Sequence, residues 1–221
     1  MKISTFISMF NVNFLFLSNY GVNKATMVMS ERVDLVDDDD VVIGTGLRSD
    51  CHGDPSLIHR AVHVLVFNDQ GKLLLQKRSA DKLIQPGKWD SSVGGHLDLG
   101  EDYRHAAARE MYEEIGVQNV PLTELYRSKI RNQIESENIV TYLALWNGAI
   151  DFSVEEIDEV CFWTDQEIEA ALGSGCFTPN FEEEWQMFKN WRKRYLAERG
   201  ERAFCAGDSF PDLFKTLRED I

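Results

Sequence analysis

This chain has few basic residues for its number of acidic ones, and that shortage limits its partners. Its 221 residues include 23 lysines and arginines against 37 aspartates and glutamates, so the formal net charge is −14. Contact with a phosphate backbone favours basic surfaces. We therefore expect no nucleic acid as the main partner, whereas a small diphosphate could still meet a local cluster of positive charge.

Cysteine is also scarce, and the sequence has no long apolar run. The four cysteines, at positions 51, 161, 176 and 205, lack the paired spacing of a metal site or a disulfide framework. The apolar stretch at residues 3–17 is too short and too interrupted by Asn and Ser for a membrane span. These features predict a cytoplasmic protein in a reducing compartment, without a membrane partner.

Composition indicates one domain with two flanking segments. We interpret residues 1–29 as an extension that is foreign to the native protein or disordered, because a polar start follows Met29 and no small-residue signal cleavage site precedes it. The chain is 43% hydrophobic, and residues 30–200 are long enough to bury a substantial core. Residues 201–221 are interpreted as a C-terminal tail.

Alternating apolar residues and turn signals predict most of the secondary structure. Strands at residues 60–67 and 72–77 are separated by a turn and are predicted to form a β-hairpin. A short strand at residues 89–93 leads into a glycine-rich loop. The remaining predicted elements are strands at residues 122–130, 139–146 and 160–163 and helices at residues 165–172 and 181–198. Aromatic residues recur at near-helical spacing in the last helix and indicate core packing.

Residues 94–117 carry the strongest functional pattern. Glycines at positions 94, 95 and 100 permit a loop that approaches a ligand closely, and the Ala-rich stretch after them favours a helix. Gly116 stands where a left-handed residue commonly ends a helix. The sequence therefore predicts a helix over residues 101–115, with Glu101 in its first turn.

Three glutamates share one face of this predicted helix. Glu110 precedes Glu113 and Glu114 by three and four residues, so their Cβ atoms are expected to lie a few ångströms apart. Like charges at these offsets destabilise an isolated helix by roughly 0.2 to 0.5 kcal/mol per pair, which a cation would offset. Carboxylate oxygens suit Mg²⁺ or Mn²⁺, and bound Mg²⁺ commonly contacts substrate phosphates as well.

From Gly95 to Val117 the chain resembles the signature of the Nudix hydrolases at every defined position. The matching residues are Gly95, Glu101, Arg109, Glu110, Met111, Glu113, Glu114, Gly116 and Val117. The resemblance implies an α+β fold, an α/β/α sandwich with a mixed sheet, to which this chain adds a C-terminal helical extension. It also implies attack of water on a diphosphate linkage in a small organic diphosphate of nucleoside or isoprenoid type.

The resemblance also implies a metal site. Glu110, Glu113 and Glu114 would be catalytic glutamates that hold Mg²⁺ or Mn²⁺, and the Gly94 carbonyl would be a further ligand. Arg109 would be the fourth catalytic residue of the pattern.

The other residues of the pattern are expected to shape the loop. Arg109 and Glu101 would hold the loop and the helix together, and Gly95 and Gly116 would complete the loop and the helix end. Members of the family place the general base differently, so the resemblance does not assign it. Dimers are common among them, so a homodimer is one expected assembly.

A second resemblance concerns three histidines. His52 and His59 lie seven residues apart and His96 follows later, in a pattern similar to that of type I isopentenyl-diphosphate isomerases, which share the Nudix fold. In that family the three histidines and downstream acids hold a metal, so the resemblance implies a second metal site, with Zn²⁺ as its candidate ion. Taken one by one, the three histidines are equally consistent with structural or surface roles. Glu135 or Glu137 would supply the acid, since the strand register leaves both open.

The isomerases define the main alternative function. They rely on a cysteine that aligns here with Gly94, and glycine cannot take that role. A second alternative is a Nudix-fold binding module without turnover. Such a module is expected to have lost glutamates of the metal helix, whereas this chain keeps all three. A hydrolase is therefore the predicted function, and its substrate stays open.

The other two histidines are interpreted as structural residues. His63 lies within an apolar predicted strand, where an interior hydrogen-bonding role is expected. His105 lies on the predicted helix and is expected to be exposed. Neither is assigned a role in the chemistry.

Overall fold

The computed structural model describes residues 31–82 and 84–198. The interpretations of residues 1–29 as an extension and of residues 201–221 as a tail lie outside these described residues. Within them the strands are β1 (Arg32–Val36), β2 (Val42–Leu47), β3 (Ile58–Phe67), β4 (Leu73–Arg78), β5 (Trp89–Asp90), β6 (Val93–His96), β7 (Thr123–Arg131), β8 (Ser136–Leu145) and β9 (Ile157–Trp163). The helices are α3 (Arg48–Cys51), α4 (Tyr103–Ile115), α5 (Asp165–Ala171) and α6 (Pro179–Glu198).

Strand β3 is the centre of a seven-stranded mixed sheet. It pairs in parallel with β8 along its whole length, from Ile58↔Ser136 to Phe67↔Leu145, and antiparallel with β6. The predicted hairpin of β3 and β4 forms, but the two strands share one register pair, Phe67↔Leu73, before β4 turns to pair with β5 and β9. Strand β6 therefore takes the place beside β3 that β4 leaves.

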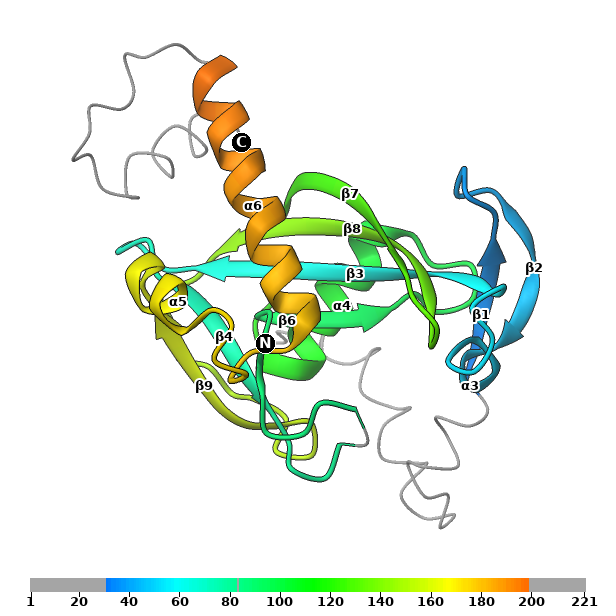
Figure 1. The fold of residues 1–221 in the computed structure, drawn as a ribbon, viewed down its shortest axis with the longest axis horizontal. Helices are drawn as coiled ribbons and strands as arrows, with labels where there is room; N and C mark the ends of the chain where they lie inside the picture. The colour runs from blue at the N-terminus through cyan, green and yellow to red at the C-terminus, as the bar shows by residue number, and fades with distance from the viewer. Residues whose placement is uncertain (1–30, 83, 199–221) are drawn as a thin grey trace, which may run out of the picture.

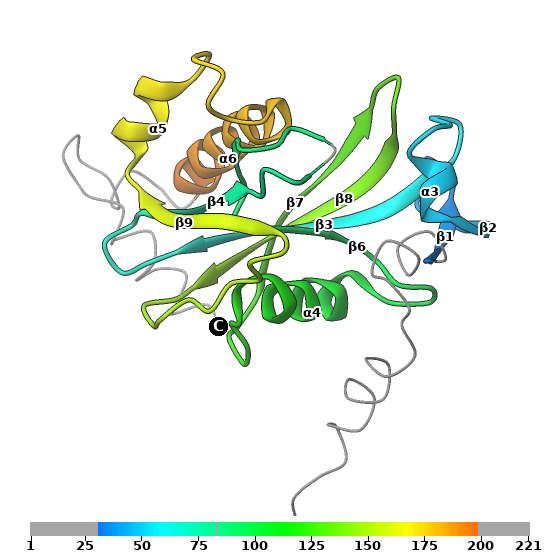
Figure 2. The same cartoon turned by 90° about the horizontal axis from the view of Figure 1, so that it is seen from below.

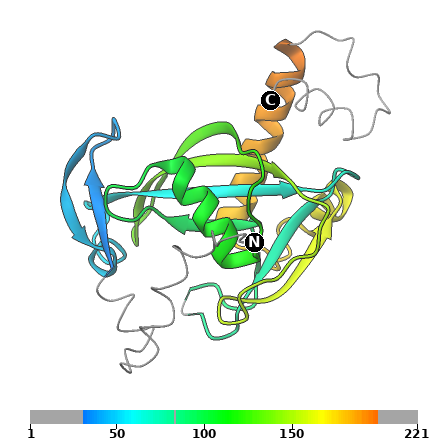
Figure 3. The same ribbon diagram turned by 180° about the vertical axis from the view of Figure 1, so that it is seen from behind.

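Helices cover both faces of this sheet. Figure 2 shows α4 on one side of the strands and α5 and α6 on the other, and Figure 3 shows α4 from behind. Because successive side chains of a strand point to opposite faces, Val62, Val64 and Val66 of β3 join a core with α4. Leu65 and Phe67 join a second core with α5 and α6. The α/β/α sandwich that the resemblance implied is therefore confirmed.

Helix α6 packs its aromatic residues against the sheet, which it crosses in Figure 1. Phe181, Trp185 and Phe188 are buried and join Leu65 and Phe67 in one core. The ring centroids of Trp185 and Phe188 are 5.7 Å apart. The aromatic stripe is thus core packing, as predicted. Although α6 has 20 residues, no helix in the described part of the chain is long and apolar enough to cross a membrane.

Helix α4 begins two residues later than predicted. Asp102 is its N-cap, and the Asp102 side chain accepts hydrogen bonds from the backbone N–H groups of Arg104 and His105. Glu101 therefore lies before the helix and not in its first turn. Gly116 ends the helix at a φ of 69°, the left-handed conformation expected of a glycine there.

One further prediction needs correction, and some elements were not predicted. Gly94 and Gly95 lie within strand β6 rather than in a loop, and the loop follows at residues 97–102. The hairpin of β1 and β2 and the one-turn helix α3 were not predicted. Strands β1 and β2 pair with each other outside the main sheet, and Val42 and Ile43 are exposed, so this hairpin lacks the half-buried alternation by which strands are recognised.

Candidate active site

Arg109 joins the loop after β6 to helix α4. Its Nε and Nη2 donate to the two carboxylate oxygens of Glu101, at 3.1 and 2.8 Å, and Nη2 also donates to the His96 carbonyl oxygen at 2.9 Å. Its Nη1 lies 2.8 Å from Glu110 and 3.1 Å from Glu113. Burial acts to lower the pKa of Arg109, but Glu101 and Glu110 outweigh burial and raise it. Arg109 is therefore a fixed cation at the centre of an acidic group.

The Glu110 carboxylate lies directly against strand β6. A Cβ added at Gly95 would lie 2.5 Å from Glu110 Oε2 and closer still to the other carboxyl atoms. No side chain other than hydrogen fits there without moving the carboxylate. Gly95 pairs with Val62 of β3, so the glycine brings Glu110 into contact with the sheet itself.

Glu114 contacts the neighbouring residue of the same strand. Its Oε2 accepts hydrogen bonds from the Gly94 backbone N–H at 3.4 Å and from the Gln76 side-chain amide at 3.1 Å. Gln76 comes from β4 and is buried. The sequence pattern did not single out Gln76, although a polar residue directly after the apolar residues 73–75 was a signal for it.

Burial raises the pKa of both carboxyl groups. It raises the pKa of Glu110 to about 7, a shift that Arg109 opposes and Glu113 increases. It raises the pKa of Glu114 to about 8, and the charge of Glu110 adds to that shift. Two carboxylates in such surroundings resist carrying charge together. A divalent cation would remove the penalty, and oxygen ligands of this kind fit Mg²⁺ or Mn²⁺.

Glu113 differs from the other two glutamates. Its side chain is 54% exposed and forms an ion pair with Arg109. Helical spacing puts all three glutamates on one side of α4, but the structure brings Glu110 and Glu114 against β6 and leaves Glu113 at the exposed rim.

A second group of candidate metal-ligand side chains lies at the end of the sheet near α3. One ligand atom from each of His52, His59, His96 and Glu137 lies within 4.8 Å of the others. The stacked rings of His59 and His96 have centroids 5.0 Å apart. Glu137 Oε1 lies 2.8 Å from His96 Nε2 and 3.3 Å from His59 Nε2. The parallel register His59↔Glu137 places Glu137 in the group rather than Glu135.

The pKa shifts of His52, His96 and Glu137 favour the protonation that metal binding requires. His52 Nε2, His59 Nδ1 and His96 Nδ1 are buried and have no hydrogen-bond partner in the described residues. Burial lowers the pKa of His96 to about 4 and also lowers that of His52. Burial acts to raise the pKa of Glu137, but bonds with His59 and His96 outweigh it and hold that pKa well below its ordinary value. Imidazole nitrogens beside an ionised carboxylate fit Zn²⁺, and a bound metal would satisfy the unpaired nitrogens.

The glutamates and the histidine group lie on opposite faces of β6. Gly95 faces α4, where it contacts Glu110. Because side chains alternate along a strand, Gly94 and His96 face the α6 side. One short strand thus connects both groups, since Gly95 contacts Glu110 and the next residue, His96, belongs to the histidine group.

Comparisons with known proteins cover the same residues. A family model described as the NUDIX domain matches residues 57–181. An uncharacterized Nudix hydrolase of Yersinia pestis is 34% identical over 150 residues, which cover 68% of this chain and 81% of that protein. An isopentenyl-diphosphate Delta-isomerase of Streptomyces avermitilis is 33% identical over 142 residues, which cover 62% of this chain and 72% of the isomerase.

A solved structure shows the same arrangement of elements. The crystal structure of DR0079 from Deinococcus radiodurans superposes with a TM-score of 0.59 at 28% sequence identity, over 67% of this chain and 92% of that one. The residues matched by the family model contain β6, α4 and β8, the strand of Glu137. The similarity therefore includes both groups of candidate ligand side chains apart from His52.

Proposed function

Because the chain belongs to the Nudix family, we propose that it is a hydrolase that cleaves a diphosphate linkage in a small organic diphosphate with Mg²⁺ or Mn²⁺. The observation that supports this proposal most directly is the position of two carboxylates against β6. Glu110 lies against Gly95, and Glu114 accepts a hydrogen bond from Gly94. Their raised pKa values indicate a place where a divalent cation would be favoured.

Each residue of this site has a proposed role. Glu110 and Glu114 would hold the cation, with the Gly94 carbonyl as a further ligand and Glu113 assisting from the exposed rim. Bound Mg²⁺ would lower the pKa of a water molecule and offset the charge that develops on the phosphoryl oxygens. Arg109 would keep Glu110 in place through their ion pair. A carboxylate of this group would accept the proton of the attacking water.

The proposal also covers the type of substrate, the assembly and the location of the protein. The substrate would be a diphosphate of nucleoside or isoprenoid type, and a homodimer is the expected assembly. A cytoplasmic location is expected because the described cysteines, Cys51, Cys161 and Cys176, are free thiols.

The proposed function is tested by incubation with Mg²⁺ and a panel of diphosphates that contains nucleotide sugars, dinucleotides and isopentenyl diphosphate. Products are identified by mass and chromatography, with EDTA in place of Mg²⁺ as the control. We expect Mg²⁺-dependent cleavage of at least one compound. Isomerised isopentenyl diphosphate without any cleavage, or no reaction across the panel, would contradict the proposal.

The histidine group supports a second metal site, which has its own prediction. Replacing His52 with Ala is expected to weaken Zn²⁺ binding by at least about tenfold, because the change removes one ligand of four. The matched control is His105→Ala, since the His105 side chain is 82% exposed and lies on α4. Metal content after dialysis against Zn²⁺ is the measurement. Equal zinc content in both variants would show that the group is structural.

An isomerase remains the second candidate function, and the histidine group is what favours it. The sequence similarity of this chain to an isopentenyl-diphosphate Delta-isomerase also favours this candidate function. Gly94 opposes it, because a residue without a side chain cannot transfer a proton to carbon. A binding module without turnover is opposed by the presence of Glu110 and Glu114 at β6.

A further inference from the structure

A buried carboxylate beneath α6 has no part in the site described so far. Glu184 is 1% exposed and belongs to α6. Its Oε2 lies 2.6 Å from His63 Nδ1, and its Oε1 accepts hydrogen bonds from the Tyr126 hydroxyl and, at 3.1 Å, from the Thr141 hydroxyl. Four elements, β3, β7, β8 and α6, therefore contribute to one polar network in the apolar core.

The network holds the His63 ring in one orientation. Burial acts to raise the pKa of Glu184, but the charge and hydrogen bond of His63 outweigh it and lower that pKa. Burial acts to lower the pKa of His63, but Glu184 outweighs it and raises that pKa to about 9. Nδ1 therefore carries the proton that Glu184 accepts, and the opposite ring nitrogen, Nε2, points away from the carboxylate.

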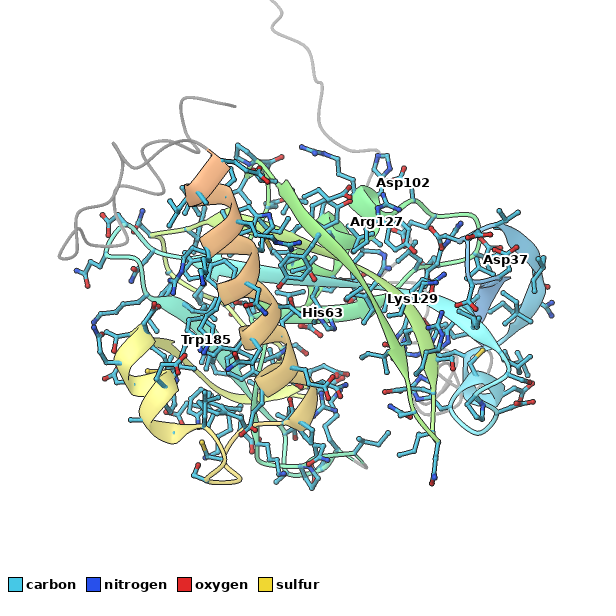
Figure 4. All side chains as sticks on the ribbon, turned by 45° about the horizontal axis from the view of Figure 1, so that its top comes forward. Asp37, His63, Asp102, Arg127, Lys129 and Trp185 are labelled. Carbon is cyan, nitrogen blue, oxygen red and sulfur yellow. The ribbon has the colours of Figure 1, made fainter. Side chains whose placement is uncertain are left out.

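His63 Nε2 faces Gly94. An atom at the Cβ position of Gly94 would lie 3.4 Å from His63 Cδ2 and 3.8 Å from Nε2, which are ordinary contact distances. The described residues give Nε2 no hydrogen-bond partner, and the His63 side chain is 16% exposed. Figure 4 shows His63 on the sheet beside α6, across that helix from Trp185. The space that a side chain at position 94 would fill is thus adjacent to Nε2.

Gly94 also connects His63 to the cation site. The backbone N–H of Gly94 contacts Glu114, while its side-chain position faces His63. Glu110 contacts the opposite face of β6, so a diphosphate held by a cation at Glu110 and Glu114 would have to extend past Gly94 for its attached organic group to reach His63. Because Nε2 is polar and the ring is fixed, an apolar group placed there would leave the nitrogen without a partner.

We propose that His63 is a specificity-determining residue whose Nε2 hydrogen-bonds to an oxygen of the group attached to the diphosphate, with Glu184 as its positioning residue. The substrate is then a diphosphate whose attached group carries hydroxyl or anionic oxygens, such as a sugar or nucleoside, and not an isoprenoid. This inference rests on the proposed function. A site built to hydrogen-bond a substrate oxygen discriminates strongly against an analogue that lacks it.

Two variants distinguish the proposed specificity role of His63 from a purely structural role of the network. His63→Asn keeps an amide nitrogen near the position of Nδ1, so it can still donate to Glu184, but it has no atom at Nε2. Tyr126→Phe removes a different hydrogen bond to Glu184 and leaves His63 in place. If the network only anchors α6, Tyr126→Phe and His63→Asn should change the melting temperature and should not change substrate preference.

The measurement is kcat/KM for the best-cleaved nucleotide sugar and for isopentenyl diphosphate. We expect the wild type to prefer the nucleotide sugar by more than about 100-fold. His63→Asn should lower kcat/KM for the nucleotide sugar by about 10- to 100-fold, mainly through KM. The value of kcat/KM for isopentenyl diphosphate should not change. Tyr126→Phe should preserve the preference. An unchanged preference in His63→Asn would overturn the inference.

A second readout does not depend on turnover. With ¹⁵N-histidine-labelled protein and Mg²⁺, in spectra recorded before cleavage, a saturating nucleotide sugar should move the Nε2 resonance of His63, whereas inorganic pyrophosphate should not. No movement with the nucleotide sugar would also overturn the inference. If the protein cleaves polar diphosphates but this resonance stays fixed, the inference fails and the proposed function stands. If no diphosphate is cleaved, the proposed function fails and the resonance alone decides the inference.

Discussion

Replacing Glu114 with glutamine is expected to lower kcat for Mg²⁺-dependent cleavage by about a thousandfold. A divalent cation supplies several kcal/mol of transition-state stabilisation, and each ~1.4 kcal/mol corresponds to a factor of ten in rate. Glutamine keeps the size of the side chain but removes the charge that would hold the cation. The measurement is kcat at saturating substrate across a Mg²⁺ titration.

The same variant should fold normally. Glu114 is a carboxylate whose pKa burial raises to about 8, so a neutral amide in its place removes a group that resists ionisation. The melting temperature of metal-free Glu114→Gln is therefore expected to equal or exceed that of the wild type. Glu159→Gln is the matched control, because Glu159 is an exposed carboxylate on β9, and its kcat should not change. A kcat within tenfold of wild type for Glu114→Gln would remove Glu114 from the proposed site.

Replacing Gly95 with alanine is expected to lower kcat by at least about a hundredfold. The added Cβ would overlap the Glu110 carboxyl group, so Glu110 must leave β6 or the strand must move. Displacement of one preorganised group at a catalytic centre commonly costs about 10²- to 10³-fold in rate. The apparent affinity for Mg²⁺ should fall together with kcat, because Glu110 is a proposed ligand.

A suitable control for this variant is Gly44→Ala. Gly44 lies on β2 and an added Cβ there would meet nothing within 4 Å, so the change introduces the same methyl group without a clash. Circular dichroism and the melting temperature check that Gly95→Ala is folded. A folded Gly95→Ala protein with wild-type kcat and Mg²⁺ dependence would show that the Glu110 position is not required for cleavage.

Much of the fold could be predicted because its elements have strong local signals. The strands that became β3, β4, β7, β8 and β9 alternate apolar residues or run apolar between turns, and α4, α5 and α6 were predicted to within a few residues. The hairpin of β1 and β2 was missed because its strands lack a half-buried alternation, and its residues also contact distant parts of the chain. One such contact joins Arg60 on β3 to Asp40 in the β1–β2 turn at 2.9 Å.

The sequence by itself determined the parts of the site that lie within one helix. The spacing of Glu110 and Glu114 puts both on one side of α4 because a helix repeats every 3.6 residues. Gly116 could be assigned to the helix end for an equally local reason, since a left-handed residue there closes the last turn. These statements need no knowledge of any other part of the chain.

Only the tertiary structure decided which side chains meet across the sheet. Gln76 reaches Glu114 from β4, Glu137 reaches the histidines through the parallel register of β3 and β8, and Glu184 reaches His63 across 121 residues of sequence. Strand pairing sets the Glu137 contact and the faces to which Gln76 and His63 point, since a shift of one residue would turn every side chain of a strand to the other face. The register follows from the burial of the whole sheet between its two helical layers, which no short stretch of the sequence contains.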